Sequence, residues 1–392
     1  MPVAQSPPSG RDVLPSWFPR RRAVVVRHGS PFRTAAMRGV PQRPGGLAVR
    51  SLLVACCCIL PATRGSGAAP EPSPVAIVFD TDIGNDVDDV LALGLIHALV
   101  SRGECELLAV TITKDNPLAA PFTDAINRFY GRGDVPIGMV RGGVTPEDGK
   151  YLPLATARTG DRFRYPHGLA SGSEAPEAVG LLRRCLAGRP DGSVVLVQVG
   201  FFTNLARLLD SPPDADSPLA GRDLVARKVR LLSVMAGAFA PINGAPHREY
   251  NVVTDLPSAR RLAAGWPTPI LWSGYEVGIA MPYPAESIER DYRSVADHPL
   301  PEAYRLYEPP PHARPTWDLT SVLVVARSDR GHFGFSPPGR VTVEADGLTT
   351  FAPAADGRDR FLTVDDRQAA RGVEAFVGLC SQPPCPHDAK PR

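Results

Sequence analysis

The chain has 392 residues, of which 43% are hydrophobic and 21% are charged, so it can bury a large core and is too apolar to be intrinsically disordered. Its 36 glycines and seven cysteines exclude a collagen-like chain and a dense disulfide scaffold. The formal net charge of +2 hides ten arginines and one acid in residues 1–66, and the remaining 33 basic and 40 acidic residues offer no excess positive charge for a nucleic-acid partner.

Residues 37–69 have the pattern of a secretory signal peptide. Arginines precede an apolar stretch at residues 51–60, small residues follow it, and the stretch is too short to span a bilayer. We therefore expect export to the periplasm or the extracellular space, without a stable membrane span. Residues 53–56 also resemble a bacterial lipoprotein cleavage box, which keeps lipidation as an alternative. Residues 1–36 are rich in proline and arginine, and we interpret them as an extension that is either disordered or untranslated.

From residue 74 to residue 382, apolar runs of strand length alternate with helical patterns. This alternation predicts a single α/β domain with a mostly parallel open sheet flanked by helices. The expected strands cover residues 75–79, 107–113, 136–140, 193–200, 229–237 and 269–273. The clearest helical patterns cover residues 88–101, 120–130, 175–187, 203–210, 256–264, 319–328 and 367–379. A small antiparallel appendage is expected near the C-terminus, at residues 341–344, 349–352 and 361–364.

Four cysteines would remain after export: Cys105, Cys185, Cys380 and Cys385. Their spacing does not match a zinc site, and we predict no cysteine chemistry. A disulfide between Cys380 and Cys385, which would close a small terminal loop, stays open at this point.

An acidic loop follows the first expected strand. Five carboxylates lie within ten residues, directly before an apolar helix: Asp80, Asp82, Asp86, Asp88 and Asp89. So many like charges repel one another unless a cation compensates them, and carboxylate oxygens suit Ca²⁺ or Mg²⁺. Helix capping explains one or two of these residues but is a poor explanation for all five. A calcium EF-hand is excluded, because its sixth position would be Asn85 instead of Gly and its twelfth Leu91 instead of Glu.

The same loop also resembles the nucleophile loop of haloacid dehalogenase-type phosphatases, in which a strand leads into Asp-x-Asp. In that interpretation Asp80 would form an aspartyl-phosphate, with Mg²⁺ as the cofactor. Ile83 stands directly after Asp82, where a Gly-Thr or Gly-Val pair would be expected. This departure disfavours a phosphohydrolase and leaves it as an alternative.

Residues 80–93 closely resemble the N-terminal signature of the inosine-uridine preferring nucleoside hydrolases, which is Asp-x-Asp-Pro-Gly-x-Asp-Asp before an apolar helix. Four later segments resemble family segments in the right order: residues 107–116, 194–206, 235–255 and 315–319. The resemblance covers about residues 75–330. It implies the α/β fold of that family and the hydrolysis of N-glycosidic bonds with Ca²⁺ as the cofactor.

The resemblance also implies roles for single residues of this chain. Asp82 resembles the aspartate that ligates Ca²⁺ and takes a proton from the attacking water. The other implied Ca²⁺ ligands are Asp89, Asp318 and the carbonyl oxygen of Val199. The residues implied in substrate binding are Asp88, Asn116, Asn243, Glu249 and Asn251 at the ribose, His167 beside the base, and Trp317. Nearby carboxylates would stabilise the positive charge that develops on the ribose ring as the bond breaks.

Three departures from the family pattern affect the predicted site. The acidic loop is two residues longer than the signature, so Asp86 competes with Asp88 for the ribose-facing role. Ile83 replaces the usual proline of the turn. Trp317 stands where purine-cleaving members have a histidine, and an indole cannot protonate a leaving base. The leaving-group acid is therefore open, and the candidates are His167, His247, Tyr275 and His312.

The sequence thus predicts an exported Ca²⁺-dependent hydrolase that cleaves a ribonucleoside or a related N-riboside, with inversion, into ribose and free base. Its expected partner is a small-molecule nucleoside. The identity of the base and a homo-oligomeric state are left open. A nucleoside-binding protein that has lost turnover is a further alternative, beside the phosphohydrolase.

Overall fold

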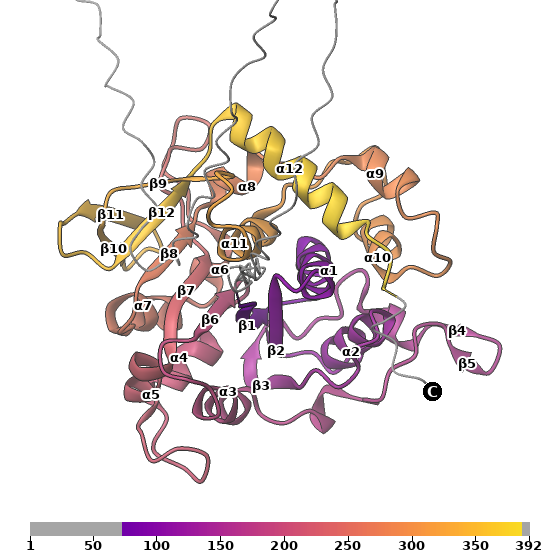
Figure 1. Cartoon of the computed structure of the whole chain (residues 1–392), viewed down its shortest axis with the longest axis horizontal. Helices are drawn as coiled ribbons and strands as arrows, with labels where there is room; N and C mark the ends of the chain where they lie inside the picture. The colour runs from indigo at the N-terminus through magenta and orange to yellow at the C-terminus, as the bar shows by residue number, and fades with distance from the viewer. Residues whose placement is uncertain (1–72, 386–392) are drawn as a thin grey trace, which may run out of the picture. The chain divides into compact units, whose positions relative to one another are not determined.

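A computed structural model of the chain describes residues 73–385 (Figure 1). The expected extension at residues 1–36 and the expected signal peptide region at residues 37–69 lie outside the described residues. Among the residues described, no helix combines the length and the apolar character needed to cross a bilayer. The cysteines of this part of the chain are all free, so no disulfide joins Cys380 to Cys385.

A mostly parallel sheet forms the centre of the described chain, as predicted. Its strand order is β11-β10-β12-β8-β7-β6-β1-β2-β3, and each neighbouring pair from β12 to β3 is parallel. The parallel strands are β1 (Val75–Thr81), β2 (Cys105–Lys114), β3 (Ile137–Val144), β6 (Val194–Gln198), β7 (Val229–Met235), β8 (Ile270–Ser273) and β12 (Asp359–Thr363). The remaining strands are β9 (Gly334–Phe335), β10 (Gly339–Val343), β11 (Thr349–Pro353) and a separate hairpin of β4 (Arg158–Thr159) and β5 (Arg162–Phe163).

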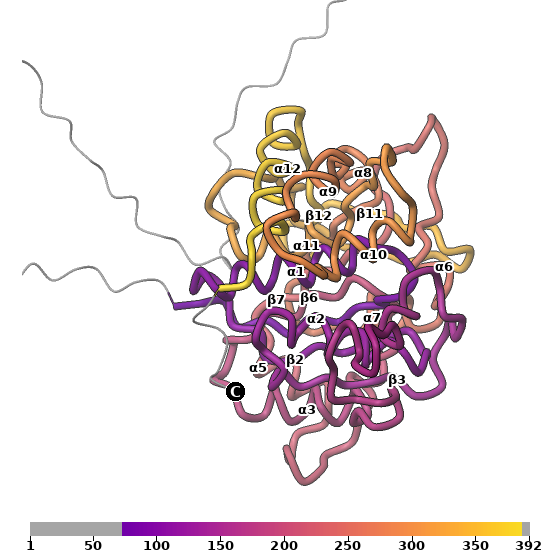
Figure 2. The backbone as a smooth tube through the Cα atoms, turned by 90° about the vertical axis from the view of Figure 1, so that its right-hand side faces the viewer, coloured from indigo at the N-terminus to yellow at the C-terminus, as the bar shows by residue number. Residues whose placement is uncertain are grey.

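Helices cover both faces of this sheet (Figure 2). One face carries α1 (Asp88–Ser101), α11 (Trp317–Ala326) and α12 (Asp366–Cys380). The other face carries α3 (Ala178–Ala187), α4 (Thr203–Asp210), α5 (Gly221–Lys228) and α7 (Leu256–Gly265). Side chains of β1 alternate between the two cores: Ile77 and Phe79 pack on the side of α1, and Val78 packs on the side of α4. Both faces of the strand are buried, which explains its continuous apolar run.

Several short helices complete the described chain. Their bounds are α2 (Ala119–Phe129), α6 (Tyr250–Thr254), α8 (Tyr275–Ile279), α9 (Ala285–Arg290) and α10 (Pro299–Tyr307), with 3₁₀ turns at Leu152–Thr156 and Gly172–Glu174. The predicted helix at residues 88–101 coincides with α1. The sequence does not predict α6, α8 or α9, because five or six residues are too few to show a helical period.

The C-terminal strands differ from the prediction in one respect. The sequence predicts residues 361–364 as part of an antiparallel appendage, whereas β12 lies parallel to β8, with Asp359 opposite Ile270 and Phe361 opposite Trp272. The antiparallel pairs among the C-terminal strands are β10 with β11, β10 with β12 and β9 with β12. Side chains alternate with the same period in both kinds of sheet, so the alternation could not show the direction of the neighbouring strand.

The carboxyl ends of the parallel strands bring the polar loops together at one edge of the sheet. β6 leaves the sheet at Gly200, where a Cβ atom would lie only 2.4 Å from the backbone nitrogen of Asp82, so glycine permits the close approach of the two segments. Tyr151 fixes the acidic loop. Its hydroxyl accepts the N–H of Gly84 at 2.6 Å and donates to the carbonyl of Asp86.

Candidate active site

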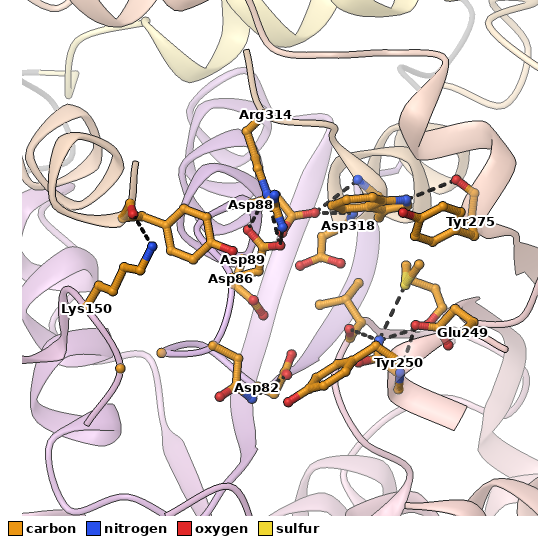
Figure 3. Close-up of a pocket in the computed structure, with 18 of the residues that line it drawn as sticks. Asp82, Asp86, Asp88, Asp89, Lys150, Glu249, Tyr250, Tyr275, Arg314 and Asp318 are labelled. Atoms are coloured by element: carbon orange, nitrogen blue, oxygen red, sulfur yellow. Dashed lines mark hydrogen bonds and ion pairs between the residues drawn. The ribbon is translucent and has the colours of Figure 1, made fainter. Parts of the chain in front are cut away.

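A cavity of about 520 Å³ lies at this edge of the sheet (Figure 3). The acidic loop, the ends of β6 and β7, α6 and the first turn of α11 contribute to its lining. The predicted site residues that line it are Asp82, Asp88, Asp89, Val199, Glu249, Asn251, Trp317 and Asp318. Segments more than 200 residues apart in the sequence therefore meet around one cavity, as the resemblance implies.

Three buried carboxylates form a compact group in this cavity. Asp88, Asp89 and Asp318 each offer an oxygen atom, and these atoms all lie within 4.8 Å of one another. Each of the three residues is at most 4% exposed. Asp82 lines the same cavity and is close enough for its charge to act on Asp89 and Asp318. An all-oxygen group of this kind suits a hard divalent cation.

Burial and mutual repulsion both disfavour ionisation in this group. Burial raises the pKa values of Asp88, Asp89 and Asp318 well above the usual range for a carboxyl, and neighbouring aspartates raise them further. Burial also raises the pKa of Asp82 to about 6. A bound cation would favour the ionised forms and remove the repulsion, so these residues fit a metal ion.

A buried cation, Lys114, lies beside the acidic loop. Its side chain is 0% exposed, and its Nζ atom donates to Asn85 Oδ1 at 2.7 Å and to the carbonyl of Thr145 at 2.8 Å. Asn85 Nδ2 in turn donates to Asp82 Oδ2 at 2.7 Å. This chain of hydrogen bonds orients the Asp82 carboxylate. No feature of the sequence marks Lys114, because a lysine at the end of a strand is usually solvated.

Arg314 is a second cation at the site, and it forms an ion pair with Asp86. Its Nε atom lies 3.0 Å and 3.1 Å from the two carboxylate oxygens of Asp86. Asp88 is held differently, because its Oδ2 atom accepts the backbone N–H groups of Trp317 at 3.0 Å and Asp318 at 3.1 Å. Asp86 is therefore neutralised by an arginine, whereas Asp88 belongs to the group that can hold a metal ion.

Glu249 and Asn251 lie at one end of the cavity, where α6 forms its wall. The Glu249 carboxylate caps this helix and accepts the N–H groups of Asn251 at 2.8 Å, Val252 at 3.2 Å and Gly237 at 3.2 Å. Burial raises the pKa of Glu249 to about 7. Asn251 Nδ2 donates to the carbonyl of Val199 at 2.9 Å. The predicted carbonyl ligand is thus held in place, and its oxygen keeps a second lone pair.

Three residues predicted to bind substrate lie in the described part of the chain but outside the lining of this cavity. Asn116 is buried and donates from Nδ2 to the carbonyl of Pro146 at 2.8 Å. His167 has backbone carbonyls 2.6 Å and 2.8 Å from its two ring nitrogens, and it lines a separate cavity of about 270 Å³. Asn243 is exposed and has a positive φ of 52°. The structure therefore does not bring these three side chains to the carboxylates.

Trp317 and Tyr275 form an aromatic wall of the cavity. Their ring centroids lie 5.2 Å apart, and the Arg314 guanidinium lies 5.1 Å from the centre of the Trp317 ring. Trp317 Nε1 donates to the backbone carbonyl of Tyr275 at 3.0 Å. The indole N–H is therefore already used inside the protein, and the ring offers its face to a ligand.

The candidate leaving-group acids are spread over the site and its surroundings. Tyr275 lines the cavity, and the His247 ring contacts the Tyr275 ring in a tilted arrangement, with ring centroids 4.1 Å apart. The Nε2 atom of His312 lies 3.4 Å from a carboxylate oxygen of Glu308. Of the four candidates, all of which are described, Tyr275 is the residue that lines the cavity.

Asp80 lies within the sheet and outside the lining of the cavity. It is 1% exposed, and its Oδ1 atom accepts hydrogen bonds from Thr111 Oγ1 at 2.5 Å and from Asn204 Nδ2 at 2.9 Å. Burial raises its pKa to about 7. A nucleophile must reach its substrate, so this placement disfavours the phosphohydrolase alternative.

The sequence model of the family described as inosine-uridine preferring nucleoside hydrolase matches residues 77–370. The chain belongs to this family. As a nucleoside hydrolase, it is an enzyme that hydrolyses N-glycosyl compounds, which confirms the predicted family and enzyme class. A small-molecule nucleoside substrate agrees with the family, and Asp88, Asp89 and Asp318 could hold the metal ion on which the family depends.

Solved structures share the fold of this nucleoside hydrolase. An inosine-uridine preferring nucleoside hydrolase from Bacillus anthracis is 18% identical with a TM-score of 0.57, and the match covers 78% of this chain and 99% of that chain. An inosine-guanosine nucleoside hydrolase is 18% identical with a TM-score of 0.58, over 78% and 98% of the two chains. A purine-preferring ribonucleoside hydrolase from Gardnerella vaginalis is 18% identical with a TM-score of 0.57, over 78% and 99%. No curated protein matches the chain significantly.

Proposed function

We propose that this nucleoside hydrolase depends on Ca²⁺ and cleaves the N-glycosidic bond of ribonucleosides into ribose and free base. One observation carries the proposal: carboxylates from the acidic loop and from α11 meet in a cavity that Glu249 and Asn251 also line. A metal site and a set of groups suited to sugar hydroxyls thus share one space. Both are needed to hold a ribose and a water molecule against each other.

The balance of charges supports a divalent cation. The aspartates that line the cavity are Asp82, Asp86, Asp88, Asp89 and Asp318. The lining also contains Glu147, Glu249 and Lys150. With Lys114 and Arg314 included, seven carboxylates and three cations leave four negative charges when all of these groups are ionised. Ca²⁺ suits the site because it accepts carboxylate and carbonyl oxygens in a flexible geometry.

Asp89 and Asp318 would hold the ion, together with Asp82 and the carbonyl of Val199 from the same cavity lining. Asp88 completes the group of carboxylates around the ion, since its oxygen lies within 4.8 Å of those of Asp89 and Asp318. Bound there, Ca²⁺ supplies a positive charge that lowers the pKa of a water molecule and orders the 2′- and 3′-hydroxyls of ribose. Asp82 accepts the proton of the attacking water, and the hydrogen bond from Asn85 keeps its carboxylate oriented for this role.

Cleavage of the glycosidic bond builds positive charge on the ribose ring. Asp88 and Glu249 stabilise this charge from within a buried site, where electrostatic interactions are stronger than in water. The Asn251 amide N–H₂ group is bonded to the carbonyl of Val199, and its carbonyl oxygen can accept a hydrogen bond from a ribose hydroxyl. The same cluster therefore binds the sugar and supports the transition state.

The departing base lies against the aromatic wall in this proposal. Trp317 stacks on the base and does not protonate it, because its N–H donates to Tyr275. Tyr275 is the candidate leaving-group acid that lines the cavity, so its hydroxyl would donate a proton or a hydrogen bond to the departing base.

Incubation of the full chain with a panel of purine and pyrimidine ribonucleosides tests the proposal, with free ribose as the readout. We expect release of ribose that stops after chelation and returns when Ca²⁺ is added. Asp82→Asn is expected to lower kcat by about 100-fold or more. Asp161→Asn is the matched control, because Asp161 is exposed in the turn between β4 and β5.

The outcomes separate the alternatives. Tight binding of nucleosides without release of ribose would identify a binding protein that has lost turnover. Hydrolysis of an aryl phosphate together with phosphorylation of Asp80 would identify the phosphohydrolase. Hydrolysis of nucleosides that survives both chelation and Asp82→Asn would contradict the proposed site.

A further inference from the structure

A second cavity, of about 360 Å³, lies between the C-terminal ends of α1 and α11 and the side of α12. Arg102 follows α1, Arg327, Arg330 and His332 follow α11, and Arg371 belongs to α12. In a βα unit the helix returns from the carboxyl end of one strand to the amino end of the next, so the ends of α1 and α11 lie at the amino edge of the sheet. This cavity is therefore on the opposite edge from the candidate active site.

The lining of this cavity carries a net positive charge. Its four arginines face one lining acid, Glu374. Glu104 adds one more negative charge next to the cavity, because its carboxylate accepts hydrogen bonds from Arg327 at 2.7 Å and from Arg330 at 3.1 Å. Two positive charges remain when these acids are ionised and His332 is neutral.

The arginines are held in place by contacts within the protein. Arg327 is 8% exposed and is fixed by two hydrogen bonds to Glu104. Arg371 donates from Nη2 to the carbonyl of Arg330 at 2.7 Å, which ties α12 to the segment that follows α11. Guanidinium groups held in this way lose little conformational freedom when they bind a ligand.

His332 provides an independent observation at this cavity. It is a lining residue and is only 8% exposed, yet neither ring nitrogen has a hydrogen-bond partner among residues 73–385. Arg371, Arg327 and Arg330 line the same cavity, and burial together with their charges lowers the pKa of His332 to about 4, so its ring is neutral near pH 7. A buried N–H group without an acceptor is costly, so an acceptor bound in the cavity would stabilise this residue.

We propose that this cavity is a binding site for a small oxyanion, either free inorganic phosphate or sulfate, or the phosphate group of a nucleotide. Arginine forks match the oxygen geometry of such anions and form charge-assisted hydrogen bonds with them. The neutral ring of His332 adds one N–H donor from the buried side. The proposal does not depend on the metal site or on nucleoside hydrolysis.

Isothermal titration of the full chain with phosphate, sulfate and adenosine monophosphate, at constant ionic strength set with chloride, tests the proposal. We expect saturable binding at one site. Arg371→Gln is expected to weaken it by roughly tenfold or more through loss of a charge-assisted contact. Arg367→Gln is the matched control, since Arg367 is exposed on α12 one turn away and changes the net charge by the same amount. Thermal unfolding of both variants is measured as well, and we expect both to remain folded.

Each outcome decides between specific binding and its alternatives. Binding of phosphate and nucleotide with equal affinity would identify a free oxyanion as the ligand, and binding of the nucleotide alone would identify a nucleotide phosphate. Equal weakening by Arg371→Gln and Arg367→Gln would overturn the proposal, because it would show attraction to general surface charge. Absence of saturable binding, or binding that Arg371→Gln leaves unchanged, would overturn it as well.

Discussion

The indole nitrogen of Trp317 donates a hydrogen bond to the backbone carbonyl of Tyr275 at 3.0 Å, next to the carboxylates of the candidate active site. The tryptophan ring is also packed tightly, because a Cβ atom on Gly278 would lie 2.0 Å from it. Trp317, which directly precedes the predicted metal ligand Asp318, therefore presents a fixed aromatic surface and cannot serve as a proton donor.

Replacement of Trp317 tests how the base departs. Trp317→His introduces a group that can protonate a purine, and we expect kcat for inosine to rise by about tenfold or more. Trp317→Phe keeps an aromatic face and removes the N–H, and we expect it to change kcat by less than about threefold. Steady-state kinetics with inosine and uridine measure both variants. No gain in the histidine variant would place activation of the leaving group on another residue, such as Tyr275.

Removal of the metal ion should make stability depend on pH. The pKa of Asp82 is raised from 3.8 to about 6 and that of Glu249 from 4.5 to about 7, so the metal-free protein loses stability as the pH rises from about 4 through 7. Bound Ca²⁺ compensates these charges. We expect Ca²⁺ to raise Tm by roughly 5–10 °C at pH 7.5 and by less at pH 5. An effect of Ca²⁺ that is the same at both pH values would argue against this carboxylate group as the metal site.

Lys114→Met removes the buried cation without changing the side-chain volume greatly. We expect the free energy of unfolding to fall by about 3 kcal/mol, because Asn85 and Thr145 lose a charged partner inside the protein. Lys114 also lowers the pKa of Asp82, so the acidic limb of the kcat/KM profile should move to higher pH in the variant.

The control for this change is Lys150→Met. Lys150 is exposed at the same cavity and donates to the carbonyl of Tyr307 at 2.7 Å. Its loss should leave the acidic limb in place. A profile that moves equally in both variants would show that Lys114 has no special relation to Asp82.

Thr349 is expected to position Glu249 from a distance. The Oγ1 atom of Thr349 accepts the N–H of Ala238 at 2.9 Å. Gly237, which directly precedes Ala238 in the chain, donates its own N–H to the Glu249 carboxylate. We expect Thr349→Val to raise KM for nucleosides by about fivefold with a smaller effect on kcat, because it loses both hydrogen bonds of the Thr349 hydroxyl with the Ala238 backbone. Thr349→Ser should restore KM because it keeps the hydroxyl.

Thr350→Val serves as the comparison for Thr349→Val. Thr350 is exposed on the same strand and donates to Glu344. An equal rise of KM in the two valine variants would indicate a general effect on β11, and the positioning role of Thr349 would be wrong.

The sequence predicts those parts of the fold that follow from local patterns. The helix at residues 88–101 was predictable because two acids precede a continuous apolar run, and α1 has these bounds. The apolar runs of the parallel strands were predictable as well, but their ends were not: β1 ends at Thr81 and β6 at Gln198, two residues from the expected ends at residues 79 and 200. The meeting of Asp82 and Val199 in one cavity required the family resemblance, because spacing in sequence does not show proximity in space.

Two cations of the site, Lys114 and Arg314, depend on contacts between residues far apart in the sequence. Lys114 bonds to Asn85, 29 residues away, and Arg314 bonds to Asp86, 228 residues away. Neither has a local motif. Asn243 is a residue that the sequence marked and the structure places elsewhere. Its position in the family-like segment before Glu249 favoured a sugar contact, whereas it lies in an exposed turn with a positive φ of 52°.

The parallel pairing of β12 with β8 means that the segment after α11, residues 327–385, is not dispensable. A chain that stopped after α11 would leave β8 with an open row of backbone donors and acceptors, which invites association between copies. It would also lack Thr349, whose hydroxyl bonds to the backbone of Ala238 next to the segment that contacts Glu249. A shortened version of this enzyme that keeps every metal ligand would therefore be expected to aggregate.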